Sequence, residues 1–175
     1  MLVQTRKAVL VMLVAIVAFF SGSTMAFAAP GGGTGNPHFL RASASINEAG
    51  QLVVNFTEAG LGNAQTATVE VTADQTATWA CQNRGGGFAP GLRTTQASVA
   101  ESGTFTADRN GRIIASLTAP EVFPPADVTC PTGQIGPLLV SVSYTNITVT
   151  DVTNDVSIDV ADVSRTLITL PRGAR

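Results

Sequence analysis

Apolar and polar residues alternate with a period of two along most of this chain. The alternation is clear in Leu40–Ile46, in Leu52–Thr57 and in Val156–Val160. Successive side chains of a β-strand point to opposite faces of a sheet, so each run predicts a strand with one apolar face. After residue 29 no stretch shows the roughly 3.6-residue period of an amphipathic helix. The pattern therefore predicts an all-β protein.

The middle of the chain predicts two short strands separated by a turn. Thr68–Thr72 and Thr76–Cys81 both alternate, and Asp74-Gln75 interrupts the apolar positions between them. Asp is typical of turns, so we place a break there. In the second strand Trp79 and Cys81 share one face, because strand side chains repeat every two residues. We therefore expect Trp79 to lie in the core beside Cys81.

A β-hairpin is predicted further along the chain. Asp108–Gly111 contains an Asn-Gly pair, which accepts the positive φ angles of tight hairpin turns. The turn follows the apolar residues Phe105 and Ala107 and precedes the alternating run Arg112–Leu117. We therefore expect the strands on either side of the turn to pair with each other.

The C-terminal part predicts a long strand with a change of parity. In Leu138–Thr150 the apolar positions switch parity after Tyr144. A β-bulge near Thr145 or Asn146 would return both halves of the strand to the core, because it inserts one extra residue. A last strand is expected over about Ser164–Leu170.

Together these runs amount to eight or nine short strands without a helix. We predict an antiparallel β-sandwich of the immunoglobulin-like type with Greek-key links and one disulfide. A closed barrel is the alternative architecture.

The N-terminal segment has a different composition from the rest. Residues 1–29 predict a signal peptide, because Arg6 and Lys7 precede an apolar run over Ala8–Phe20 and a small-x-small cleavage site at 26–28. The apolar run is too short to span a bilayer comfortably. We predict a flexible Gly-rich leader over 30–38, a single β-sandwich domain over 39–171 and a C-terminal tail over 172–175. The expected location is secreted and extracellular, with no membrane anchor after cleavage.

Cys81 and Cys130 are the only cysteines. An even pair in an exported chain predicts one disulfide. A redox-active or metal-binding pair is the alternative, but neither a CxxC spacing nor a companion histidine supports it. The two cysteines adjoin Gln82–Leu92 and Pro120–Pro137, which are rich in Gly and Pro. A disulfide would therefore bring both loops to one end of the sandwich.

The charge balance and the missing motifs exclude several functions. Ten basic and twelve acidic residues give a net charge of -2, and removal of Arg6 and Lys7 makes the chain more acidic. Binding to nucleic acid requires a basic surface instead. The sequence contains no GxSxG elbow, HExxH helix or phosphate loop. We predict no cofactor, no catalytic residue and no nucleic-acid partner.

A carboxylate-based, glycosidase-like hydrolase is one alternative function, because two suitably spaced acids suffice for glycoside hydrolysis. The acids available for it are Asp108, Glu101, Glu121 and Asp127. The sole histidine, His38, lies in or beside the leader, which makes it a poor general base.

A calcium-binding module is the other alternative. Calcium takes six to eight oxygen ligands. The acidic tail supplies candidates, but their spacing differs from that of an EF-hand and is typical of turns and exposed strand positions. We therefore predict no metal site there. The candidates are Asp151, Asn154, Asp155, Asp159 and Asp162.

A binding or structural role is the function that the sequence favours. The loops of a rigid sandwich often carry recognition. The Gly-rich loop Gln82–Leu92 and the residue that follows it offer Asn83, Arg84, Phe88 and Arg93 as contacts. A guanidinium group suits bidentate pairing with a carboxylate. We therefore expect an envelope polymer or an extracellular protein as the partner.

Four short motifs carry a resemblance that covers most of the chain after residue 29: Phe56–Gly62, Ala77–Asn83, Cys130–Gln134 and Val142–Asn146. In them the sequence resembles a group of small secreted actinobacterial β-rich proteins of unknown function, a resemblance that implies no particular activity. The turn at 106–111 also resembles those of bacterial immunoglobulin-like domains and of neocarzinostatin-type carriers. Those carriers have two disulfides and this chain has one predicted, so their chromophore-carrying role is not transferred.

Overall fold

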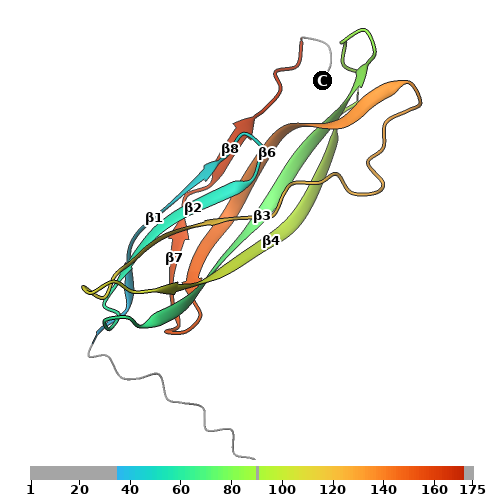
Figure 1. The fold of residues 1–175 in the computed structure, drawn as a ribbon. Helices are drawn as coiled ribbons and strands as arrows, with labels where there is room; N and C mark the ends of the chain where they lie inside the picture. The colour runs from blue at the N-terminus through green and yellow to red at the C-terminus, as the bar shows by residue number, and fades with distance from the viewer. Residues whose placement is uncertain (1–34, 90, 172–175) are drawn as a thin grey trace, which may run out of the picture. The chain divides into compact units, whose positions relative to one another are not determined.

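The computed structural model describes residues 35–89 and 91–171, and these residues form two antiparallel β-sheets (Figure 1). The predicted signal peptide, most of the predicted leader and the predicted tail lie outside the described residues. Within the described ranges there is no helix of the length and hydrophobicity that crossing a bilayer requires. The prediction of an all-β sandwich is confirmed.

The smaller sheet has three strands in the order β1-β2-β5. Their bounds are β1 His38–Ile46, β2 Leu52–Ala59 and β5 Ile113–Thr118. The central strand β2 is buried most deeply, with Leu52 and Val54 fully buried and Phe56 2% exposed. These residues are the apolar positions of the predicted alternation, so the inner face of this sheet follows directly from the sequence pattern.

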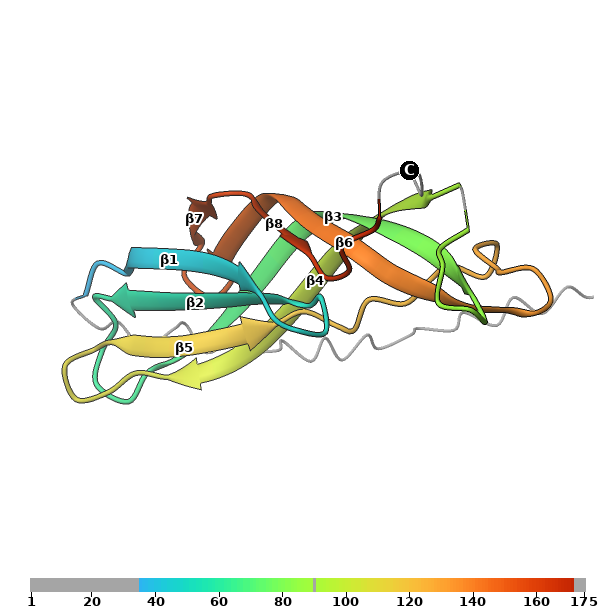
Figure 2. The same ribbon diagram turned by 90° about the horizontal axis from the view of Figure 1, so that it is seen from above.

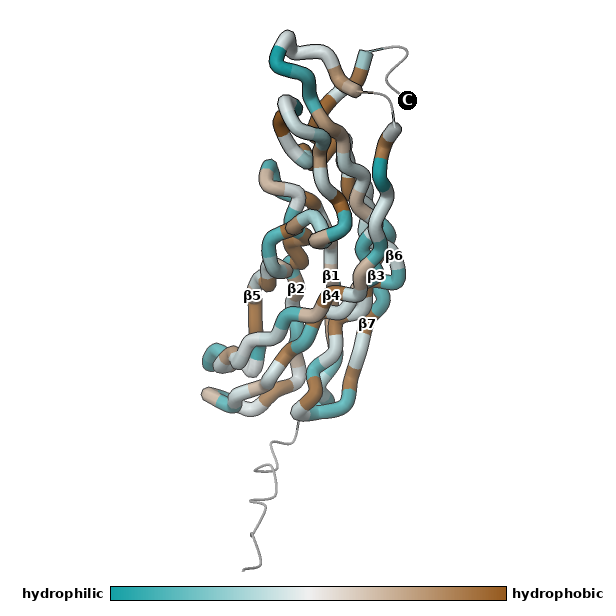
Figure 3. Tube along the Cα trace, turned by 90° about the vertical axis from the view of Figure 1, so that its right-hand side faces the viewer, coloured by the Kyte–Doolittle hydropathy of each residue, from teal (hydrophilic) through white to brown (hydrophobic). Residues whose placement is uncertain are grey.

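The larger sheet has five strands, in the order β4-β3-β6-β7, with β8 also paired to β6. Figure 2 shows this sheet behind the three strands of the smaller one, and Figure 3 shows β5 and β2 in one layer and β3, β6 and β7 in the other. The bounds are β3 Thr66–Asn83, β4 Arg93–Thr106, β6 Gln134–Asp151, β7 Val156–Val160 and β8 Val163–Thr166.

The two sheets differ in length, and this divides the core into two parts. β3 and β6 have 18 residues each, whereas β1 has nine and β2 eight. The turn between β1 and β2 marks the boundary, because Gly50 lies over the inner face of β6 and its carbonyl accepts a hydrogen bond from Tyr144 Oη at 2.9 Å. A side chain at position 50 would begin 2.6 Å from Leu139 Cδ2, and the φ of 84° there also favours glycine.

We call the part of the core beneath the smaller sheet the sheet-covered half, and the part beneath residues 119–133 the loop-covered half. Buried residues of both halves belong to one continuous hydrophobic core. The sheet-covered half contains Phe56, Val69 and Val149, and the loop-covered half contains Trp79 and Val128. Trp79 is 3% exposed, as its place in the alternation predicts.

The predicted turn at Asp74-Gln75 is wrong, because β3 runs through both residues without a break. Asp74 points outward, where its carboxylate accepts hydrogen bonds from Ser98 Oγ at 3.1 Å and Asn146 Nδ2 at 2.9 Å. Gln75 points inward, where its Nε2 donates to Tyr144 Oη at 3.0 Å. Both polar side chains are therefore satisfied by neighbouring strands, which removes their local preference for a turn.

The predicted hairpin at Asp108–Gly111 is also wrong, because the strands on either side belong to different sheets. β4 pairs with β3, and β5 pairs with β2. The turn itself is closed locally by Asp108, whose Oδ1 accepts from the N–H groups of Asn110 at 2.8 Å and Arg112 at 3.0 Å. The Asn-Gly signal thus marked a tight turn correctly, but the turn connects the two layers.

A β-bulge at Asn146 explains the change of parity in β6, as predicted. Asn146 has a φ of 52°, and the pairing of β3 with β6 shifts register opposite this residue. As a result Tyr144 and Ile147 both face the core and are at most 1% exposed. The last strand is shorter than predicted, since β8 ends at Thr166. The strands number eight among the described residues, but β3, β4 and β6 are not short.

Candidate functional site

The disulfide joins the end of β3 to residues 119–133, the loop that covers the loop-covered half of the core. Cys81 and Cys130 are bonded with a Cα–Cα distance of 5.7 Å, which confirms the predicted pairing. The bond ties residues 119–133 to the larger sheet at the point where the smaller sheet no longer reaches. Both Gly- and Pro-rich loops thereby meet at one end of the molecule, and a pocket lies between them.

This pocket, which we call the cystine pocket, has a volume of about 320 Å³. Three segments line it: the end of β3, the residues that lead into β4, and the loop with the start of β6. The lining residues are Trp79, Ala80, Cys81, Ala89, Gly91, Arg93, Val128, Thr129, Pro131, Gln134 and Pro137.

The walls of the cystine pocket are held in place by bonds outside the pocket. Trp79 Nε1 donates to Thr95 Oγ1 at 3.0 Å, which orients the indole ring in the wall of the pocket. Arg93 stands opposite Trp79 in the pairing of β3 with β4 and is exposed. Val128 is 7% exposed and packs into the core. The pocket therefore combines fixed apolar walls with one cationic group at its rim.

Gln134 gives the pocket a second polar group. Its Oε1 is buried and has no hydrogen-bond partner among the described residues. A buried carbonyl oxygen without a donor costs free energy. Together with the guanidinium of Arg93, the amide of Gln134 can orient a polar ligand group.

The four predicted contact residues are not all brought together. Asn83 is the exposed last residue of β3, where its N–H donates to Gly87 O at 2.7 Å, and Arg84 is exposed in the turn that follows. Phe88 is half-buried and forms an isolated bridge with Gln82. Of the four residues Arg93 alone lines the cystine pocket.

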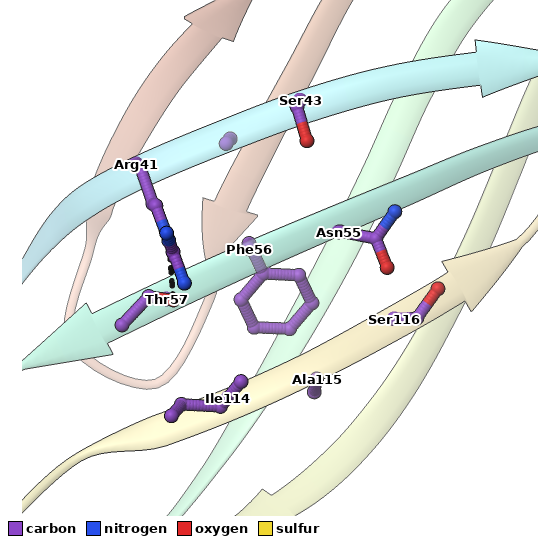
Figure 4. Close-up of a pocket in the computed structure, with 9 residues that line it drawn as sticks. Arg41, Ser43, Asn55, Phe56, Thr57, Ile114, Ala115 and Ser116 are labelled. Atoms are coloured by element: carbon purple, nitrogen blue, oxygen red, sulfur yellow. Dashed lines mark hydrogen bonds between the residues drawn. The ribbon is translucent and has the colours of Figure 1, made fainter.

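A second, larger groove of about 580 Å³ lies on the outer face of the smaller sheet (Figure 4). Arg41, Asn55, Thr57 and Ile114 are among the residues that line it. Arg41 Nε donates to Thr57 Oγ1 at 3.2 Å across the face of the sheet. The groove runs over the solvent side of three strands, and its cation is already engaged by a neighbouring side chain. It is therefore a weaker candidate than the cystine pocket.

The sheet-covered half contains a pair of buried acids. Glu58 on β2 and Asp151 on β6 are both fully buried. Asp151 accepts hydrogen bonds from the N–H groups of Thr153 at 2.8 Å and Asn154 at 3.2 Å, and from Asn154 Nδ2. Neither oxygen of Glu58 receives a hydrogen bond from a donor in the described part of the chain.

The surroundings of Glu58 favour its protonated form. Burial, followed by a hydrogen bond to and charge repulsion from the neighbouring Asp151 carboxyl, raises the pKa of Glu58 from 4.5 to about 8. Two ionised carboxylates only accept hydrogen bonds, so the bond between Glu58 and Asp151 forms only when one of them carries a proton, and that proton supplies the partner that the Glu58 oxygens otherwise lack. Because neither residue is exposed, a substrate cannot reach this pair.

The sequence pattern contained a signal for Glu58. It extends the inward-facing series Leu52, Val54 and Phe56 by one more step of two. An ionisable residue on an apolar face is unusual, so the alternation alone does not mark Glu58 as a candidate acid.

The four acids considered for a hydrolase lie in different parts of the structure and are not brought together. Asp108 closes the turn between the sheets, and Glu101 lies half-exposed on β4. Glu121 and Asp127 are exposed in the loop that carries Cys130. His38 is the exposed first residue of β1, and its Nδ1 lies 2.7 Å from Asn36 O.

The acidic residues near the C-terminus differ in burial. Asp151 faces the core, whereas Asp155, Asp159 and Asp162 are exposed. The described residues contain no group of three or more His, Cys, Asp or Glu side chains that could hold a metal ion.

Comparison with known proteins gives no family for this chain. No protein-family model matches it, and no curated protein matches it. The resemblances noted from its sequence motifs therefore stay predictions, and functional inference depends on the chain's own residues.

Proposed function

We propose that this chain is an exported, non-catalytic binding protein that holds an acidic group of an extracellular or envelope polymer in the cystine pocket. The observation that carries the proposal is the pocket itself, in which Arg93 stands at the rim of apolar walls fixed by the disulfide.

Two features support export. The N-terminal sequence has the order of charge, apolar run and small residues of a signal peptide. The disulfide is compatible with an extracellular location, because such bonds persist in oxidising compartments. The immunoglobulin-like character belongs to the same proposal, and two antiparallel sheets around a buried tryptophan beside a cystine support it.

The dimensions and chemistry of the pocket support binding of a small group. Its volume of about 320 Å³ lies at the lower end of ligand pockets. Val128, Pro131 and Pro137 offer apolar surface, and Arg93 offers a planar set of donors that suits a carboxylate. A sugar acid at a chain end, or a side-branch carboxylate of a polymer, fits these requirements.

Calorimetric titration with an acidic oligouronide and a neutral oligoglucoside of equal length tests the proposal. We expect the acidic oligomer to bind and the neutral one to bind at least tenfold more weakly, because it lacks the partner for Arg93. Arg93→Gln should remove this preference. Arg109→Gln is the matched control, since Arg109 is exposed in the turn between the sheets.

A second variant separates the pocket from the loop tip. Arg84→Ala combined with Phe88→Ala changes the hairpin beyond the pocket and should leave affinity for the oligouronide nearly unchanged. Equal binding of both oligomers, or full retention of binding by Arg93→Gln, would reject the pocket as the site. Turnover of ester, peptide or glycoside substrates by the purified protein would reject the non-catalytic assignment.

A further inference from the structure

The outer edge of β4 is unpaired. β4 is the terminal strand of the larger sheet and pairs only with β3 (Figure 1). No backbone hydrogen bond joins another part of the described chain to this outer edge. An edge strand presents a row of free N–H and C=O groups, which is a template for pairing with another strand.

The other sheet edges carry features that oppose such pairing. β1 contains Arg41 and a shift of register beside it, and β1 lies against β7 and β8. β7 has five residues and includes Asp159, and β8 has four and includes Arg165. β5 has six residues and lies against β4 near Gly103. Short strands, bulges and central charges are the usual means of protecting an edge.

β4 has none of these protections over most of its length. The strand has 14 residues, and its segment Thr94–Ala100 contains no charge, proline or glycine. The segment is bounded by one cation, Arg93, and one anion, Glu101. The two charges are eight positions apart along the strand, an even spacing, so both side chains lie on the same face of the sheet.

We propose that β4 is a self-association surface, through which two copies of this chain pair antiparallel about a twofold axis at Ala97. In this register Arg93 of each copy lies opposite Glu101 of the other, so both charges of both copies are matched. Opposite charges at facing positions of antiparallel strands attract each other. An isologous contact about a twofold axis satisfies both edges and leaves neither open for further addition.

The side chains between the charges also fit this register. Thr95 faces Val99 of the second copy on the half-buried inner face, and these are β-branched residues that suit a sheet. Gln96 faces Ser98 on the exposed outer face. Ala97 faces its own counterpart on the axis, where a small side chain lets the strands approach. A register shifted by two residues would leave all four charges without a facing partner.

The oligomeric state of the protein expressed from the full sequence tests the proposal. Sedimentation velocity should show a dimer at high micromolar concentration. Glu101→Arg should shift the protein to monomer, because it places two arginines opposite each other, and the addition of Arg93→Glu should restore the dimer. Glu48→Arg is the control for a charge change outside the strand, since Glu48 is exposed in the β1–β2 turn.

Oxidative cross-linking tests the register. Ala97→Cys places the introduced thiols opposite each other on the twofold axis, so mild oxidation should give covalent dimers. Ser43→Cys, on the exposed face of β1, should give none under the same conditions. A protein that stays monomeric throughout, a dimer indifferent to Glu101→Arg, or a failure of Ala97→Cys to cross-link would each overturn the proposal. Ala97 and Glu101 do not line the cystine pocket, so Glu101→Arg and Ala97→Cys test the pairing without changing that pocket, whereas Arg93→Glu changes both surfaces and serves only to restore the pairing.

Discussion

The sheet-covered and loop-covered halves of the core are shielded from solvent by different kinds of structure. In the first, β2 presents a row of large apolar side chains to β3 and β6, and Phe56 makes edge-to-face contacts with Phe39 and Phe105 at ring distances of 6.0 and 5.5 Å. In the second, residues 119–133 replace a strand, and a disulfide holds them on the sheet. A strand is held by a ladder of hydrogen bonds, whereas a loop of this length lacks one and gains from a covalent link.

The difference explains where the pocket lies. Side chains from two facing sheets interdigitate and fill the space between them. A proline-rich loop has no regular alternation with which to do so, and the cystine pocket lies beside it. Of the four predictions below, the first two test packing in the sheet-covered half and covalent linkage in the loop-covered half, and the other two test the buried acids and the boundary between the halves.

Removing packing from the sheet-covered half should have the largest effect. Phe56→Ala should lower the free energy of unfolding by about 3–5 kcal/mol, because it leaves a cavity where two aromatic contacts were made. Phe123→Ala is the same substitution in the loop that covers the other half, where the side chain is 70% exposed and contributes little packing. Its effect should be within about 0.5 kcal/mol. Comparable losses in urea denaturation would contradict the division into two halves.

Removing the covalent link should be the next largest effect. Cys81 and Cys130 are 49 residues apart, and closing a loop of that size stabilises a fold by about 4 kcal/mol in the chain-entropy model. Cys81→Ala with Cys130→Ala should therefore lower the free energy of unfolding by about 2–4 kcal/mol. Hydrogen exchange should rise mainly in residues 119–133. A uniform rise across β2 and β5 would show that the link supports both halves equally.

The buried acids of the sheet-covered half should make its stability depend on pH. The pKa of Glu58 in the folded protein is about 8, above its ordinary value of 4.5, so the folded state binds the proton more tightly than the unfolded state. The stabilising contribution is complete below about pH 4.5 and is lost as the pH rises through about 8.

Glu58→Gln should remove most of this dependence, because folding of the variant no longer requires a proton at this position. At about pH 7 the variant should be more stable than the parent by on the order of 3 kcal/mol. Thermal unfolding across the pH range measures the effect, and Glu48→Gln at an exposed position is the control. A parent whose stability rises between about pH 5 and 8 would contradict the assignment of the proton to Glu58.

The smallest effect is expected at the boundary between the halves. Tyr144→Phe removes the hydroxyl that accepts from Gln75 Nε2 and donates to Gly50 O. The loss of free energy should be about 1–2 kcal/mol, because Gln75 is left buried without this partner. Gln75→Leu in the same background should recover part of the loss. No change in Tyr144→Phe would mean that the network does not connect the β1–β2 turn to the larger sheet.

Some of this fold was accessible from the sequence because one face of each strand is apolar. The alternation placed β2 and Trp79 correctly, and the change of parity after Tyr144 revealed the bulge. β4 was missed over most of its length because an exposed edge strand buries little, so its sequence contains few apolar positions. The break at Asp74-Gln75 was wrong because the partners that satisfy these residues lie on other strands.

The candidate site was only partly accessible for a similar reason. The two cysteines and their loops indicated which end of the molecule to inspect, and Arg93 was among the residues chosen. The walls formed by Val128, Pro137 and Gln134 depend on how the loop crosses the sheet, which no local pattern specifies. The pairing of Glu58 with Asp151 likewise depends on which strands of the two sheets face each other.

The placement of Trp79 and Tyr144 gives the molecule built-in optical reporters. Each is the single residue of its type in the chain. The indole lines the same pocket as Cys81, so its emission follows the loop-covered half, whereas the phenol lies where the two halves meet. Fluorescence and near-ultraviolet circular dichroism can therefore distinguish detachment of the loop from separation of the sheets without any added label.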